Sequence, residues 1–193
     1  MRSAGARSLG GLYRRGPMVR SVAIRRRSLA SLVAALLALV LLAGGPLAGR
    51  AGADDLELAR VVQVHLERVQ PKVQTLGKRL QRYVKTPTNR TRARSAGRAA
   101  DAVHREVATM RSSISRTDAS SAEGATLRRD LLRALRDVRD ATGTIGSGLR
   151  RVGSRRANLA TVRSLQRAQR QLDRGVRRAE RVLNEIARAA GVG

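Results

Sequence analysis

In four stretches of the chain, apolar residues recur at alternating intervals of four and three positions. These stretches run from Val62 to Tyr83, from Ala96 to Ile114, from Leu127 to Val152 and from Val162 to Ala190. Such spacing places apolar side chains along one side of a helix, as in helical bundles and coiled coils. No stretch shows the sustained alternation of a half-buried strand. The pattern therefore predicts an all-α domain.

Helix-ending residues separate the four stretches. Pro87 disfavours helix at the residue before it, and Asn89 can cap the helix that follows. Ser120-x-x-Glu123 has the spacing of a capping box for the third helix. Short connections between helices of similar length favour antiparallel neighbours, so an up-down-up-down, coiled-coil-like four-helix bundle is expected. The predicted helices span residues 54–85, 89–116, 121–152 and 155–190.

Two features act against regular helices of this length. Pro71 lies inside the first helix and is expected to kink it. Gly143, Gly146 and Gly148 fall inside the third, where each glycine costs about 1 kcal/mol relative to alanine. The sequence leaves open whether the third helix continues through them or ends near Ala141.

The N-terminal part of the chain has the three features of a secretory signal peptide. Arg25, Arg26 and Arg27 precede a segment, residues 29–43, that is apolar apart from one serine. A small-x-small site, 51–53, follows. We therefore predict a signal peptide over residues 1–53, its apolar region at 29–43, and a mature domain over 54–193. Met18 would give a leader of more usual length, in which case 1–17 are not part of it.

Export follows from this reading, and the mature protein is expected to be secreted, periplasmic or in the cell envelope. An uncleaved anchor is the alternative, because residues 29–49 are uncharged and about 20 apolar residues span a bilayer. Arg26-Arg27 gives a weak twin-arginine match, but no cofactor motif calls for export in the folded state, which favours the general secretory route.

Charge is distributed unevenly over the mature domain. Residues 54–193 carry 31 Lys and Arg against 14 Asp and Glu, a net of +17. Residues 68–100 and 141–172 contain no acid, and their 17 basic residues account for the whole excess. These windows surround the first and third interhelical loops, which share one end of an up-down bundle. We call ten basic residues in and beside those loops the basic pole: Arg82, Lys85, Arg90, Arg92, Arg94, Arg98, Arg150, Arg151, Arg155 and Arg156.

Unpaired like charges destabilise a compact protein, and few i,i+4 pairs such as Asp101–Arg105 offset this repulsion. An anionic partner would relieve it. We therefore expect an exported binding or scaffolding protein whose basic pole contacts an anionic envelope polymer, lipid head groups at a membrane surface, or another polyanion. Sequence-specific reading of nucleic acid is not expected, because the chain has two Tyr and no Phe or Trp to stack on bases.

The alternative is an interaction protein whose apolar stripes pair with a second copy or with another helical chain, its charge serving only solubility. The preference for Arg (37 residues) over Lys (three) is itself attributed to a GC-rich genome. The sequence fixes neither the ligand nor the oligomeric state.

No motif indicates catalysis, a metal or a cofactor. The chain has no cysteine, so thiolate metal sites and disulfides are excluded. His65 and His104 are predicted to flank the apolar stripes, offset by about 7 Å along the bundle and too far apart to share a metal. Met110 is level with His65, but no C-x-x-C-H or large aromatic supports haem. Asp137 and Asp140 are expected on a solvated face, and the protein is not expected to be an enzyme.

The export prediction can be tested by replacing Leu36, Leu37 and Leu39 with Asp. Each charge at the centre of the apolar segment opposes insertion by about 2.5 to 3.5 kcal/mol, so the precursor should remain in the cytoplasm. N-terminal sequencing of the wild-type exported protein should give Asp54 as the first residue. A first residue upstream of Leu29 would establish the uncleaved anchor instead.

Overall fold

A computed structural model describes residues 53–119 and 121–189 of the chain, and the predicted apolar region at 29–43 lies outside them. The described residues form four α-helices: α2 (Ala53–Lys85), α3 (Arg90–Arg116), α4 (Ala122–Gly153) and α5 (Leu159–Ala189). The first three begin and end within one residue of the predicted bounds, whereas α5 begins four residues later than predicted. None of these four helices is long and apolar enough to cross a membrane.

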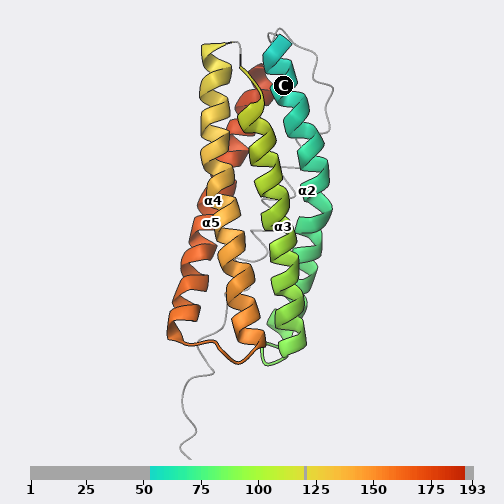
Figure 1. Cartoon of the computed structure of the whole chain (residues 1–193), viewed down its shortest axis with the longest axis vertical. Helices are drawn as coiled ribbons and strands as arrows, with labels where there is room; N and C mark the ends of the chain where they lie inside the picture. Colours follow the sequence, from blue (N-terminus) through green and yellow to red (C-terminus); the bar gives the residue numbers. More distant parts are fainter. Residues whose placement is uncertain (1–52, 120, 190–193) are drawn as a thin grey trace, which may run out of the picture.

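The helices run alternately up and down, so the predicted all-α, up-down-up-down four-helix bundle is confirmed (Figure 1). α3 packs most extensively on α4, α4 packs on α5, and α2 packs on α3. The α2–α3 and α4–α5 loops lie together at the lower end in Figure 1. The α3–α4 connection and the first residues of α2 lie at the opposite end.

The core is formed by the apolar stripes that the periodicity predicts. Leu76 on α2, Met110 on α3, Leu131 on α4 and Leu172 on α5 are each at most 2% exposed. The other described residues of these stripes are buried in the same way, apart from partly exposed Val152, Val162 and Leu165. Tyr83, 2% exposed, is the largest fully buried side chain and closes the core near the α2–α3 loop.

Side-chain caps fix where three of the helices begin. Asn89 Oδ1 accepts a hydrogen bond from the Arg92 amide at 3.0 Å, as predicted for the start of α3. At α5, Asn158 Oδ1 accepts from the Thr161 amide at 2.9 Å. The cap predicted at Ser120 is wrong by one residue: Ser121 is the N-cap of α4, and its Oγ accepts from the Gly124 amide at 2.8 Å.

α4 does not end at Ala141 but continues through its glycines to Gly153. Their lack of a side chain allows close packing. A Cβ placed on Gly146 would lie 2.3 Å from Asp101 Oδ1, and one on Gly143 would lie 2.9 Å from the His104 ring. From α3, a Cβ on Gly97 would lie 3.1 Å from the Gly146 carbonyl oxygen. Intimate helix contact therefore compensates for the low helix propensity of glycine.

α2 is likewise uninterrupted at Pro71. The proline ring leaves the backbone without one amide donor. One turn later, Thr75 Oγ1 donates a hydrogen bond to the Pro71 carbonyl oxygen at 2.8 Å. The position is exposed, so solvent can satisfy the remaining backbone groups.

Replacing a buried residue should lower the free energy of unfolding of this fold far more than replacing an exposed one. Leu76→Ala and Leu183→Ala should each lower the free energy of unfolding by about 2 to 5 kcal/mol, because they leave cavities in the core. Arg82→Ala, at an exposed site on the same helix as Leu76, should cost less than about 0.5 kcal/mol. Thermal or denaturant unfolding measures all three, and equal small effects would contradict the bundle.

Candidate functional site

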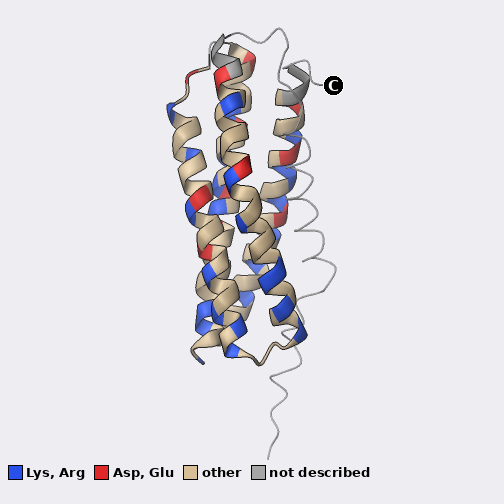
Figure 2. Cartoon of the chain, turned by 90° about the vertical axis from the view of Figure 1, so that its right-hand side faces the viewer, with Lys and Arg blue, Asp and Glu red and all other residues tan. Residues whose placement is uncertain are grey.

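One half of the bundle contains no acidic residue. Counted from the end that holds the α2–α3 and α4–α5 loops, the first acid on α2, α3, α4 and α5 is Glu67, Asp101, Asp140 and Asp173 respectively. At 1.5 Å per residue these positions lie about 16 to 27 Å along their helices. Figure 2 shows the result: Lys and Arg continue to the lower end, and Asp and Glu are confined to the rest. We call this region the acid-free half.

The basic pole forms the end of the acid-free half. All ten of its residues are exposed, although they come from α2, α3, α4 and the α4–α5 loop. The opposite end of the bundle carries exposed acids, among them Glu57, Asp118 and Glu123. The domain is thus electrically asymmetric along its long axis.

A hydrogen bond joins the two sequence windows that contribute to the pole. Arg94 Nε, in the first turn or two of α3, donates to the Gly153 carbonyl oxygen at the end of α4 at 3.1 Å. A Cβ on Gly153 would lie 2.5 Å from Arg94 Cγ and 3.1 Å from the Arg90 carbonyl oxygen. The start of α3 and the end of α4 are therefore in direct contact, and residues about 60 positions apart form one surface.

Arg92 braces the first loop. Its guanidinium donates to Thr86 Oγ1 at 2.6 Å and to the Arg82 carbonyl oxygen at 3.2 Å. Arg92 and Arg94 thus donate hydrogen bonds to backbone and hydroxyl groups of the pole. Both residues are nonetheless exposed to solvent.

Arg150 is the one member of the pole that forms an ion pair within the described residues. Its partner is Asp101, at the boundary of the acid-free half. The sequence-based pairing of Asp101 with Arg105 is therefore wrong. The reason is tertiary: Asp101 packs over Gly146, and this directs its carboxylate toward α4 instead of along α3.

Arg155 adopts a left-handed backbone conformation, with φ of 60°. It follows the C-cap Ser154, and the next two amides turn back on the helix. Arg155 N–H donates to Val152 O at 3.3 Å and Arg156 N–H to Arg151 O at 2.9 Å. This is the Schellman arrangement, in which the left-handed position is usually glycine because a Cβ is disfavoured there.

In the other half of the bundle, some of the arginines pair with acids. Arg178 on α5 pairs with Asp137 on α4 at 3.0 Å, and Arg139 pairs with Asp140 at 2.6 Å. Both aspartates are half-buried, so the predicted solvated face is wrong for Asp137, which instead links two helices. Other arginines of this half, such as Arg105, Arg129 and Arg136, are exposed and form no ion pair among the described residues.

A partly buried polar cluster lies between α2 and α3. His65 is 6% exposed and belongs to the core face, contrary to the predicted flanking position. Its Nδ1 lies 3.8 Å from Glu106 Oε1 and has no hydrogen-bond partner, while the other Glu106 oxygen pairs with Lys72. Burial, and then the charge of Arg68, lower the pKa of His65, although Glu106 opposes both. The imidazole is therefore neutral near neutral pH.

His104 is separate from this cluster. Its Nδ1 lies 2.8 Å from the Arg139 carbonyl oxygen, and its ring covers Gly143. No group of three or more His, Cys, Asp or Glu side chains with metal-binding geometry occurs among the described residues.

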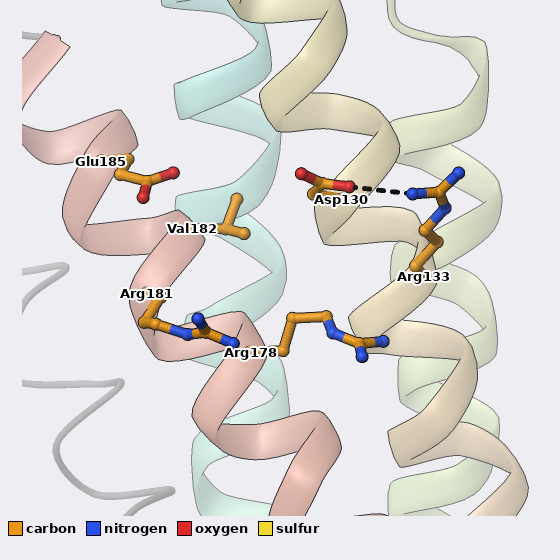
Figure 3. Close-up of a pocket in the computed structure, with 6 residues that line it drawn as sticks. All are labelled: Asp130, Arg133, Arg178, Arg181, Val182 and Glu185. Atoms are coloured by element: carbon orange, nitrogen blue, oxygen red, sulfur yellow. Dashed lines mark hydrogen bonds and ion pairs between the residues drawn. The ribbon is translucent and has the colours of Figure 1, made fainter.

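A groove of about 400 Å³ lies between α4 and α5, outside the acid-free half (Figure 3). Asp130 and Arg133 line it from α4 and pair with each other at 3.3 Å. Arg181, Val182 and Glu185 line it from α5. Figure 3 shows these side chains dispersed along the two helices and not converging on one point, which is typical of a solvated surface.

Comparisons with protein families, with curated proteins and with solved structures give no match to this chain.

The conformation of Arg155 generates a stability prediction. Arg155→Gly should raise the free energy of unfolding by about 0.5 to 1 kcal/mol, because glycine relieves the left-handed strain but gains freedom in the unfolded chain. Arg156→Gly is the control. Arg155 is the one non-glycine residue with positive φ in the described chain, so glycine at position 156 relieves no strain and should not stabilise the protein. Denaturant unfolding measures both, and equal effects would rule out strain at Arg155.

Proposed function

We propose that this protein is a binding or scaffolding protein of the exported compartment, and that its basic pole contacts polyanions such as anionic envelope polymers or lipid head groups. The observation that carries this proposal is the acid-free half. Seventeen basic residues lie in the two windows that meet there, and among the described residues only Lys72 and Arg150 of these form ion pairs, with Glu106 and Asp101.

Repulsion among the arginines of the pole favours an anionic partner. Exposed guanidinium groups held on one rigid surface repel one another, and salt screens them only beyond about 8 to 10 Å. Arginine also presents a planar set of donors that matches phosphate and carboxylate oxygens. A polyanion bound at the pole would remove the repulsion and release its own counterions, both of which favour binding.

The alternative function, pairing of apolar stripes with a second copy or another helical chain, has less support. The stripes are buried within the chain itself. Among the described residues, the exposed large apolar side chains are Val64 and Leu159, which lie on different helices and form no seam.

Polyanion binding can be tested with two matched triple variants. The first-loop variant replaces Lys85, Arg90 and Arg98 with Gln. The second-loop variant replaces Arg151, Arg155 and Arg156 with Gln. Arg92 and Arg94 are left unchanged because they brace the loops. Long-chain polyphosphate and phosphatidylglycerol vesicles are the probes, with affinity measured over a range of salt concentration.

The control variant replaces Arg105, Arg129 and Arg136 with Gln. These three are exposed, form no ion pair among the described residues and lie outside the acid-free half. Each pole variant should bind more weakly than the control, and its slope of log affinity against log salt should be shallower by about 2 to 3. Equal losses in all three variants would show that binding follows net charge alone and would refute the pole.

A further inference from the structure

Exposed arginines of the acid-free half are not confined to the end of the bundle but extend along the outward faces of its helices. Two stripes lie on helices that flank α4 on its two sides. The α3 stripe is Arg90, Arg94 and Arg98, and the α5 stripe is Arg163, Arg167 and Arg170.

Each stripe lies opposite the apolar residues of its helix. On α3, positions three and four residues apart place the stripe on one side, while Ala93, Ala96 and Ala100 are buried on the other. On α5, Ala168 and Leu172 are buried while the stripe is exposed. The α5 stripe therefore faces solvent, and the α3 stripe is exposed beside α4, where Arg94 contacts Gly153.

The packing order of the helices places the two stripes on different faces of the bundle. α3 contacts α4 through Gly97 and Gly146, whereas α5 contacts the other side of α4, where Gly148 faces Leu165 of α5. Helices on opposite sides of a third helix expose faces that point in different directions. A flat membrane could contact one stripe, or the end of the bundle, but not both stripes together.

We propose that the partner of this surface is a flexible, linear polyphosphate chain that wraps around the acid-free half and contacts the α3 and α5 stripes at once. This inference rests on the proposed function and narrows it to one class of partner. A flexible chain can follow a convex surface, and each further contact raises its affinity because the later contacts are intramolecular. No acid interrupts its path on any of the four helices in that half.

The test uses two double variants of the full exported domain. The α3 double variant is Arg90→Gln with Arg98→Gln, which keeps the bond from Arg94 to Gly153. The α5 double variant is Arg163→Gln with Arg170→Gln. A quadruple variant combines them, and Arg129→Gln with Arg136→Gln is the matched control. Circular dichroism and thermal unfolding establish that each variant is folded.

Three probes distinguish the partners: tripolyphosphate, long-chain polyphosphate, and vesicles of phosphatidylglycerol in phosphatidylcholine. For the long chain, each double variant should reduce the salt slope by about 1.4 to 1.8 relative to the control, and the quadruple variant by about 3. Tripolyphosphate is too short to reach both stripes. Its affinity per phosphate should therefore be lower than that of the long chain, and the quadruple variant should not lose the summed affinity of the two double variants.

Other outcomes overturn the inference in separable ways. If one double variant binds the long chain as the control does, or if vesicles bind while chain length has no effect, wrapping is refuted and the proposed function stands. If the quadruple variant binds every probe as tightly as the control does, both the inference and the proposed function fail.

Discussion

The close approach of α3 and α4 is the contact on which the arrangement depends. At Gly97 and Gly146 the two backbones lie so close that a Cβ on Gly97 would be 3.1 Å from the Gly146 carbonyl oxygen. The contact between α3 and α4 is also the most extensive between helices. It directs Asp101 toward Arg150 and places Gly153 against the first turns of α3. Because two basic windows meet at that point, the same glycines that shape the core also bring together charges that repel one another.

The sequence predicts the fold well because spacing of apolar residues is a local property. The positions of the four stripes, the cap at Asn89 and the antiparallel order all follow from residues near one another in the chain. The effect of the glycines in α4 could not be predicted in this way. Helix propensity describes an isolated helix, in which glycine is unfavourable, whereas here a neighbouring helix occupies the space that a side chain would need.

The candidate site shows the same division. Acid-free windows and loop order are enough to predict that basic residues gather at one end. The sequence does not indicate that Arg92 and Arg94 brace the loops, that Arg150 is paired, or that Arg155 is left-handed, because each depends on contacts made by the folded chain. His65 was misplaced for a related reason: it lies next to the apolar stripe, and only the proximity of α3 determines that it is buried.

The direction of α2 determines which end of the bundle faces a point of attachment. α2 begins at the end that carries Glu57 and runs for 33 residues, about 50 Å, before it reaches the α2–α3 loop. A chain tethered through residues 29–43 would therefore be held by the end with acidic residues. Its arginines would extend outward from the lipid surface, and the bundle would act as a rigid spacer that sets how far from the bilayer a polymer is held.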